Sequence, residues 1–101
     1  MKTMLHYISE HYREELNTAL IAKSVMISES ECLRCFRSTI GTPPIQYVRQ
    51  FRIQKASELL TSTEQKITDI AIQSGFQDMS YFTKTFRELK GCTPSEYRSN
   101  Q

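Results

Sequence analysis

The chain has 101 residues, of which 39% are hydrophobic and 24% are charged, with three glycines, three prolines and no tryptophan. This length suffices for one compact domain and is too short for two independent cores, and the composition excludes a disordered tail. Thirteen basic and eleven acidic side chains give a net charge of +2, too small to indicate a polyanionic partner by itself.

The charges are unevenly distributed along the chain. Residues 1–31 hold three basic and five acidic side chains, whereas residues 32–101 hold ten basic and six acidic ones. We therefore expect any basic surface to lie in the later two thirds of the chain.

No run of about 18 apolar residues occurs, which argues against a membrane-spanning helix and a membrane partner. The three cysteines, Cys32, Cys35 and Cys92, are an odd number, which is more typical of a reducing cytosol than of a disulfide framework. We therefore expect a cytoplasmic protein.

Apolar residues recur at spacings of three and four, which predicts helices rather than strands. A first helix is expected to end near Tyr12, on a stripe made of Met1, Leu5, Ile8 and Tyr12. Asn17 is a good N-cap for a second, short helix that reaches about Val25. The inward residues of that helix are expected to be Ile21, Ala22 and Val25.

Ser28 and Glu31 form an S-x-x-E capping box, which predicts the start of a third helix that runs to Ile40. Gly41 follows directly, as is typical just past the end of a helix. The buried face of this helix is expected to hold Cys32, Cys35 and Phe36.

Pro44 suits the first turn of a longer, fourth helix that reaches Leu60. The polar residues 61–64 are expected to break it. Its apolar residues lie toward both ends: Ile45, Val48, Ile53, Ala56, Leu59 and Leu60.

Three further helices are predicted: a fifth over about Ile67 to Ser74, a sixth from the cap Asp78 to about Lys90, and a last one from Pro94 through Tyr97. Their inward residues are expected to be Ile67, Ile70 and Ala71 in the fifth helix, and Phe82, Phe86 and Leu89 in the sixth. The sequence therefore predicts an all-α fold of about seven helices.

The two halves of the chain repeat each other. Phe36-Arg37, Gly41, Pro44 and Tyr47 recur fifty positions later as Phe86-Arg87, Gly91, Pro94 and Tyr97. Upstream, Ile21-Ala22 matches Ile70-Ala71 one residue out of phase, so the second copy is expected to have one more residue in its turn. Each copy is a short helix, a tight turn and a longer helix, which is the helix-turn-helix arrangement.

We therefore expect one domain over residues 1–101 that contains two helix-turn-helix subdomains. The first is expected at about 1–43, a long central linker helix at about 44–60 and the second subdomain at about 61–101. A linker of this length spans on the order of 25 Å. It can hold two recognition helices near one turn of DNA apart, about 34 Å, so that one monomer contacts two successive major-groove segments.

The second helix of a helix-turn-helix lies in the major groove of DNA. The outward residues of the third helix are expected to be Ser30, Glu31, Leu33, Arg34 and Arg37, and those of the sixth helix Met79, Ser80, Tyr81, Thr83, Lys84 and Arg87. Under the fifty-residue shift, Arg34 matches Lys84 and Arg37 matches Arg87. Arginine can donate two hydrogen bonds to guanine, and Lys, Ser, Thr and Tyr can bind phosphates or bases. The alternative is that these cations are merely solvated.

The sequence resembles the AraC-type family of bacterial transcription regulators. In the second half, the resemblance rests on Ile67-Thr68-Asp69-Ile70-Ala71, Gly75-Phe76, Ser80-Tyr81-Phe82, Phe86, Gly91, Pro94 and Tyr97-Arg98. The first half agrees less closely, through Leu16, Ile21-Ala22, Ser28, Arg34, Phe36, Gly41, Tyr47, Arg52, Ala56 and Leu59-Leu60.

The resemblance implies duplex DNA as the ligand, and activation of transcription through contact with RNA polymerase. It also implies that the outward residues of the third and sixth helices recognise bases. Here these are Ser30, Glu31, Leu33 and Arg34, and Met79, Ser80, Tyr81 and Lys84. Because 101 residues leave no room for a ligand-binding domain, we expect either a small regulator or part of a longer one with an N-terminal effector or receiver domain.

Three positions depart from the family pattern. Glu29 and Glu31 place carboxylates at the tip of the third helix, where they suit the helix dipole but repel phosphate. Glu31 either accepts a hydrogen bond from cytosine N4 or only caps the helix, and both interpretations stay open. Leu33 can touch a thymine methyl group, and Leu20 is expected to point outward where the family usually has a polar residue.

The sequence gives less support to a metal site, a redox site or a catalytic site. Cys32-x-x-Cys35 resembles half of a zinc or redox site, but no second pair completes four ligands, and packing is the favoured interpretation. His6 and His11 are expected on the surface. With no nucleophile motif and no phosphate-binding glycine loop, we expect no enzyme, no catalytic residue, no metal and no cofactor.

A protein-interaction module is the alternative function. It would dock through the acidic N-terminal region of Glu10, Glu14 and Glu15, together with Leu20, and would not recognise bases.

Overall fold

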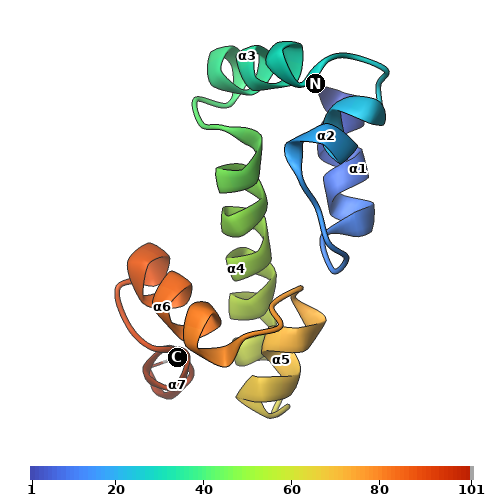
Figure 1. Cartoon of the computed structure of the whole chain (residues 1–101). Helices are drawn as coiled ribbons and strands as arrows, with labels where there is room; N and C mark the ends of the chain where they lie inside the picture. Colours follow the sequence, from blue (N-terminus) through green and yellow to red (C-terminus); the bar gives the residue numbers. More distant parts are fainter. Residues whose placement is uncertain (101) are drawn as a thin grey trace. The chain divides into compact units, whose positions relative to one another are not determined.

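The computed structural model describes residues 1–100, and over these residues it contains seven α-helices and no strand (Figure 1). The helices are α1 (Lys2–His11), α2 (Thr18–Lys23), α3 (Glu29–Thr39), α4 (Pro44–Ser62), α5 (Ile67–Gln73), α6 (Met79–Lys90) and α7 (Pro94–Ser99). The all-α prediction is confirmed. The chain divides into two compact units, Met1–Arg49 (unit 1) and Gln50–Gln101 (unit 2), and α4 contributes residues to both.

Unit 1 contains the first helix-turn-helix, which is formed by α2 and α3. Helix α2 packs against both α1 and α3 (Figure 1). The buried hydrophobic residues of this unit are Met4, Ile8, Ile21, Ala22, Cys32, Phe36 and Val48. They come from four helices, so α3 is fixed by packing on its inner side and leaves its other side exposed.

Helix α1 ends at His11, with Tyr12 as its C-cap, as predicted. Of the predicted apolar stripe, only Ile8 is buried, whereas Met1, Leu5 and Tyr12 are only partly buried. Met4, which was not part of the predicted stripe, is buried as well. Met1 and Tyr12 lie at the helix ends, where the side chains do not all reach the core. Met4 and Ile8 are four residues apart and therefore share the face that meets the rest of unit 1.

Helix α2 begins after Asn17, whose side-chain oxygen accepts a hydrogen bond from the backbone N–H of Leu20 at 2.8 Å, which confirms the predicted N-cap. The helix ends at Lys23, two residues before the predicted end. The chain then turns through Met26, whose φ is +59°. Val25 lies in this turn and is only partly buried.

Helix α3 begins after Ser28, as predicted, and Ser28 Oγ accepts from the backbone N–H of Glu31 at 3.2 Å. Cys32 and Phe36 are buried, but Cys35 is only half-buried. The prediction for Cys35 was therefore only partly right. Cys35 lies at the edge of the buried face, three residues from Cys32, so part of its side chain contacts the core and part is exposed to solvent.

Helix α4 continues to Ser62, beyond the predicted end at Leu60. The hydroxyl groups of Thr61 and Thr63 bond back to helix carbonyls, Thr61 Oγ1 to Ser57 at 3.3 Å and Thr63 Oγ1 to Leu59 at 2.7 Å. Threonine can bond in this way inside a helix turn, so a run of hydroxyl residues does not by itself end a helix. Near the start of α4, Ile45, one of the apolar residues noted for this helix, is 39% exposed.

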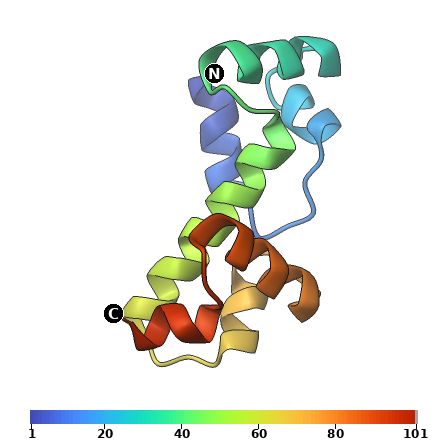
Figure 2. The same ribbon diagram turned by 90° about the vertical axis from the view of Figure 1, so that its left-hand side faces the viewer.

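Unit 2 contains the second helix-turn-helix, which is formed by α5 and α6. One hydrophobic cluster holds it together: Ile53, Ala56, Leu60, Ile70, Ala71, Phe76, Phe82 and Phe86, with Leu59, Ile67, Met79, Leu89 and Tyr97 packed against it. Figure 2 shows α7 beside the end of α4. There the Arg98 guanidinium donates to the carbonyls of Leu60 at 3.0 Å and Thr63 at 3.3 Å.

The predicted repeat is confirmed by equivalent packing in the two units. The Tyr47 ring lies 5.9 Å from Phe36, and the Tyr97 ring lies 5.4 Å from Phe86 (centroid to centroid). After α3 and α6, the chain turns through Gly41 and Gly91, with φ of +93° and +82°. Pro44 and Pro94 then begin α4 and α7, and both are buried.

Candidate nucleic-acid interface

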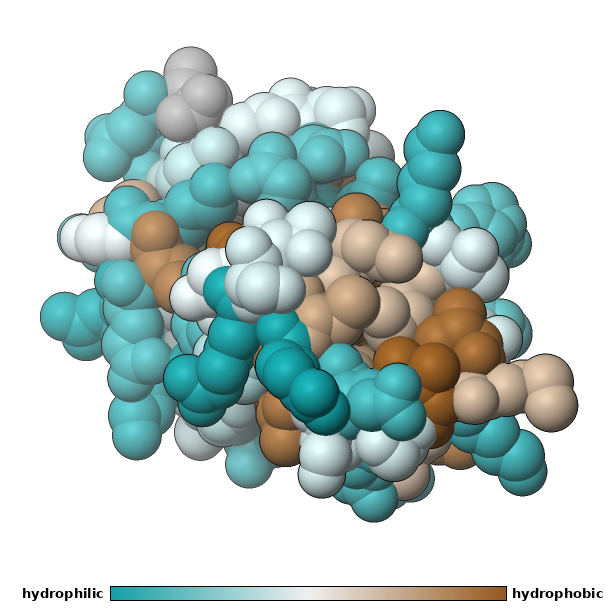
Figure 3. Space-filling model, turned by 90° about the horizontal axis from the view of Figure 1, so that it is seen from above, coloured by the Kyte–Doolittle hydropathy of each residue, from teal (hydrophilic) through white to brown (hydrophobic). Residues whose placement is uncertain are grey.

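The outer face of α3 carries the residues predicted for it. Ser30, Glu31, Leu33, Arg34 and Arg37 are all exposed. An open hollow along this helix is lined by Glu31, Arg34, Cys35 and Ser38. Figure 3 looks down on the end of the molecule that carries α3, and strongly hydrophilic side chains lie there beside less polar ones. The face therefore offers charged groups and apolar contact area together.

The first turn of α3 is strongly acidic, because Glu29 and Glu31 are both exposed there. Only one half of the predicted capping box is formed: the Ser28 hydroxyl accepts from the Glu31 N–H and itself donates to Glu31 Oε1 at 3.3 Å. Within residues 1–100, the Glu31 carboxylate has no ion pair with a cation. It therefore projects from the helix with one long hydrogen bond.

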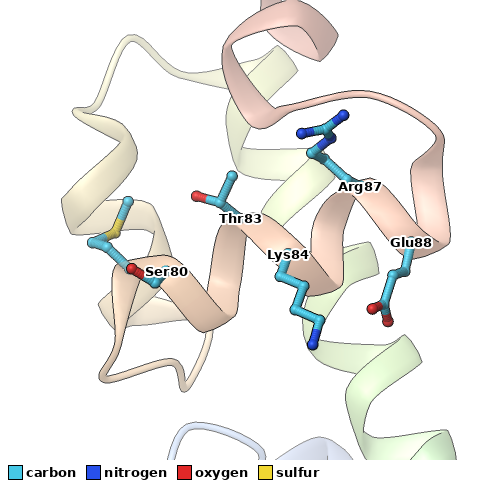
Figure 4. A pocket seen from close by; sticks show the side chains of 6 residues that line it. Ser80, Thr83, Lys84, Arg87 and Glu88 are labelled. Atoms are coloured by element: carbon cyan, nitrogen blue, oxygen red, sulfur yellow. The ribbon is translucent and has the colours of Figure 1, made fainter.

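The outer face of α6 is its counterpart in unit 2. Ser80, Tyr81, Lys84 and Arg87 are exposed. An open hollow runs along the helix, lined by Met79, Ser80, Thr83, Lys84, Arg87 and Glu88 (Figure 4). In Figure 4, Thr83 and Arg87 project to one side of the helix axis, and Lys84 and Glu88 to the other. Polar side chains on both sides of the α6 axis thus border the same solvent-accessible hollow.

Two residues predicted to face outward on α6 are only partly exposed, Met79 and Thr83. Met79 packs against the hydrophobic cluster of unit 2. The reason is its spacing: Met79 lies three residues before Phe82 and seven before Phe86, on the same apolar stripe. The prediction of a fully outward Met79 is wrong, although it still borders the hollow on α6.

The start of α6 is held by Asp78, as predicted. Its carboxylate accepts from the backbone N–H groups of Ser80 at 2.8 Å and Tyr81 at 3.3 Å. The Tyr81 ring is 6.0 Å from the ring of Phe76 and remains 48% exposed. Partial burial lowers the pKa of the nearby Arg52 guanidinium, and Tyr81 opposes this effect. The Asp78 cap and the contact between Tyr81 and Phe76 therefore hold the first turn of α6 in place, while its outer side remains exposed to solvent.

The repeated cations occupy the same places on the two faces. Arg34 lies in the second turn of α3 and Lys84 lies in the second turn of α6, and both side chains are exposed. Neither forms a salt bridge within the described part of the chain. Arg37 and Arg87 follow three residues later and are also exposed. Arg87 lies close enough to Glu96 to contribute to the lowered pKa of that carboxyl.

Ser38 and Glu88 were not predicted for the two faces, yet each lines the hollow on its helix. They follow Arg34 and Lys84 by four residues, and residues four apart on a helix share a face. The same spacing, together with the fifty-residue shift that relates Ser38 to Glu88, was a signal in the sequence that could have identified them.

The Cys32-x-x-Cys35 pair is divided between core and surface. Cys32 is buried with its Sγ atom 3.8 Å from Met4 Sδ, and burial raises the pKa of its thiol. The packing interpretation is therefore confirmed for Cys32.

The two histidines each lie near a carboxylate of the same segment. His6 Nε2 is 3.7 Å from Glu10 Oε1, and His11 Nδ1 is 3.0 Å from Glu14 Oε2. Within residues 1–100, no group of three or more His, Cys, Asp or Glu side chains is arranged to hold a metal ion.

A family model described as a helix-turn-helix domain matches residues 21–100, which is most of the chain. A solved structure described as a transcriptional regulator with an AraC-type DNA-binding domain, from Chromobacterium violaceum, superposes with a TM-score of 0.92. It is 29% identical and covers 98% of this chain and 88% of the other. The chain belongs to the AraC-type helix-turn-helix family.

Two further comparisons give the same fold or sequence pattern. The HTH-type transcriptional regulator YdeC of Bacillus subtilis (strain 168) is 39% identical over 98 residues, which are 97% of this chain and 34% of YdeC. The DNA-binding domain of AdpA, solved in complex with a target DNA, has a TM-score of 0.91 at 26% identity and covers 96% of this chain and 87% of that one. The chain thus spans about a third of the length of this curated relative.

Several AraC-type signature residues have structural roles in this chain. Arg98 donates hydrogen bonds to the carbonyl of Leu60, in the last turn of α4, and to that of Thr63, just after the helix. Tyr97 packs against Phe86. Thr93 and Glu96 form a full capping box at α7, which the sequence analysis missed although its T-x-x-E pattern was visible. Among residues 1–100, no helix combines the length and the hydropathy that a membrane-spanning segment requires.

Proposed function

We propose that this AraC-type domain recognises a specific sequence in duplex DNA by placing α3 and α6 in the major groove, and that it is the DNA-binding part of a transcription regulator. The observation that carries the proposal is the exposed, repeated pair of cations: Arg34 and Arg37 on α3, and Lys84 and Arg87 on α6. The complex of the related AdpA domain with its target DNA supports the choice of ligand.

The positions of these cations on each helix suit two different tasks. The N-terminal part of a recognition helix contacts base edges, so the exposed residues of the first two turns face the bases. Arg34 can donate two hydrogen bonds to guanine O6 and N7, and Lys84 can contact the same atoms. Arg37 and Arg87 lie a turn further along, where contact with backbone phosphates is expected to fix the register of the helix.

The ionic-strength dependence of binding tests the ligand. The affinity of the domain for arbitrary duplex DNA is measured by fluorescence anisotropy between 50 and 300 mM salt. Two phosphate contacts predict a slope of log K against log salt of about −2 or steeper. The Arg37→Ala and Arg87→Ala variants are each expected to reduce the slope by about one unit. A flat response, or no binding at low salt, would instead favour the protein-interaction module.

Footprinting tests the assignment of both helices. On a site selected from random DNA, the domain is expected to protect two major-groove segments. The double variant Arg34→Ala/Arg37→Ala should lose one segment, and Lys84→Ala/Arg87→Ala should lose the other. If both double variants lose the same segment, or if only one segment is protected in the parent, the two-helix proposal is wrong.

We further propose that the regulator activates transcription through contact with RNA polymerase, which places it in the compartment that contains the DNA. Leu20 supports this part of the proposal, because it is an apolar side chain of α2 that is 38% exposed. The α2 surface around Leu20 is therefore the candidate for this protein contact, and its test is given in the Discussion.

A further inference from the structure

The strongest unassigned feature of the DNA-facing surface is the carboxylate of Glu31. An acidic side chain on a surface that faces a polyanion is unfavourable unless it has a specific partner, because it repels the phosphates. Glu31 is exposed in the first turn of α3, one turn before Arg34, and both residues line the same hollow. It therefore lies on the face proposed to contact bases.

The backbone hydrogen bond of a full capping box does not occupy this carboxylate. A full capping box requires the Glu side chain to accept from the N-cap backbone N–H. At α7 this bond is present: Glu96 Oε1 accepts from the Thr93 N–H at 2.9 Å. At α3, Glu31 Oε1 instead accepts from the Ser28 hydroxyl at 3.3 Å. The two carboxylates occupy matching positions in their helices, yet only Glu96 is used by the backbone.

We propose that Glu31 is a specificity-determining residue that selects cytosine in the DNA segment contacted by α3, beside the guanine contacted by Arg34. The proposal rests on the proposed function. It adds the identity of a base that the α3 face prefers, and it predicts unequal half-sites, because the matching position on α6 is the phenol of Tyr81.

The chemistry of the base edges makes this choice specific. An ionised carboxylate only accepts hydrogen bonds. In the major groove, cytosine presents the N4 amino donor, guanine presents two acceptors, and thymine presents an acceptor and a methyl group. Adenine presents a donor beside the N7 acceptor, whose lone pair opposes a second carboxylate oxygen. Cytosine is therefore the base edge that a carboxylate contacts without repulsion.

The spacing of Glu31 and Arg34 fits neighbouring base pairs. Residues three apart on a helix lie on one face with Cβ atoms about 5–6 Å apart, and they are separated by about 4.5 Å along the helix axis. Successive base pairs are about 3.4 Å apart. An acceptor and a bidentate donor at this spacing can thus contact a cytosine and a guanine in adjacent pairs.

Selection from a pool of random duplex DNA, with sequencing of the bound fraction, tests the proposal. The parent domain is expected to enrich a site with a C·G pair next to the guanine whose preference is lost in Arg34→Ala. In Glu31→Gln, the preferred base should change from cytosine to adenine, because a glutamine amide can bond adenine N6 and N7 together. The ratio of cytosine to adenine at that position should fall by about five- to a hundredfold.

Glu29→Gln is the matched control. It removes the same negative charge from the same exposed helix turn. Both variants are therefore expected to bind all DNA somewhat more tightly, whereas only Glu31→Gln should change the preferred base. Thermal unfolding of the variants shows that each retains the fold.

Two outcomes would overturn the assignment, and they are distinguishable. If the parent enriches a site and Glu31→Gln retains its preference or changes it no differently from Glu29→Gln, Glu31 does not select cytosine while the proposed function stands. If the parent enriches no sequence at all, the proposed function fails and the assignment of Glu31 fails with it.

Discussion

Met26 and Gly75 occupy the same turn position in the two helix-turn-helix units. Both have positive φ, +59° for Met26 and +97° for Gly75. The next residue in each unit, Ile27 or Phe76, donates its N–H to the carbonyl of the matching alanine, Ala22 at 3.1 Å or Ala71 at 2.9 Å. The same turn is therefore built once with glycine and once with a side chain that disfavours this conformation.

We predict that Met26→Gly stabilises the domain by about 1 kcal/mol, because it relieves the left-handed backbone strain. The Met26 side chain is 93% exposed, so little packing is lost. Urea unfolding followed by circular dichroism measures the change. Met26→Ala is the control, since alanine keeps the strain and should give no comparable gain. An equal gain for both variants would show that the side chain, and not the backbone, is responsible.

Arg34→Ala is expected to weaken binding to a selected site by about 1–3 kcal/mol and to relax the preference at one base pair. The reason is the loss of a bidentate contact with guanine. Arg13→Ala, which removes an exposed arginine outside the helix-turn-helix of unit 1, should leave the affinity almost unchanged. Equilibrium binding to the selected site and to single-base variants of it measures both effects. An equal loss on every sequence would make Arg34 a phosphate contact only.

Leu20→Ser is expected to leave DNA affinity intact and to lower transcription from a promoter that carries a selected site. The expectation follows from the exposure of Leu20 on α2. Reporter expression and DNA binding are measured in parallel, with Met26→Ser as a control for the loss of an exposed apolar side chain. A marked loss of unfolding free energy in Leu20→Ser would mean that this residue belongs to the core.

Arg98→Ala is expected to destabilise the domain by about 1–3 kcal/mol, because it removes two charged hydrogen bonds, one to the Leu60 carbonyl in the last turn of α4 and one to the Thr63 carbonyl just after that helix. Arg98→Lys retains the charge near the helix end and should recover part of the loss. Chemical unfolding provides the measurement. If Arg98→Lys is as unstable as Arg98→Ala, the charge itself contributes little and the geometry of the guanidinium is decisive.

The stability of the domain should depend on pH through Glu96. The backbone N–H and the side chain of Thr93 hold the pKa of this carboxyl below its usual value. A carboxyl with a lowered pKa in the folded state stabilises the fold above the unfolded pKa, about 4.3, and this stabilisation is lost as the pH falls through the lower folded pKa.

The free energy of unfolding of the parent should therefore exceed that of Glu96→Gln at pH 7, and the difference should diminish as the pH falls below the unfolded pKa and through the lowered pKa of the folded carboxyl. Unfolding curves at a series of pH values provide the test. Glu64→Gln, an exposed residue of the same unit, is the control. A difference between the parent and Glu96→Gln that persists unchanged into acid would contradict the role of the ionised carboxylate.

Much of the fold could be predicted because the signals are local. Asn17 and Asp78 mark their helix starts within three residues, and the repeat of Phe36 and Tyr47 as Phe86 and Tyr97 specifies equivalent packing. Positions at the edge of a helix face could not be predicted in this way. Cys35 was predicted to be buried with Cys32 and Phe36, but it is only half-buried. How deeply such an edge residue is buried depends on how closely the neighbouring helices approach, which helix periodicity does not specify.

The sequence by itself determined the helices, the two matching units and the residue types on the outer faces of α3 and α6, because helix periodicity and capping act over a few neighbouring residues. Only the tertiary structure decided which of these residues reach solvent and which distant partners meet. Arg98 lies 38 residues from Leu60 and yet bonds its carbonyl. Such contacts form only when packing brings separate segments together.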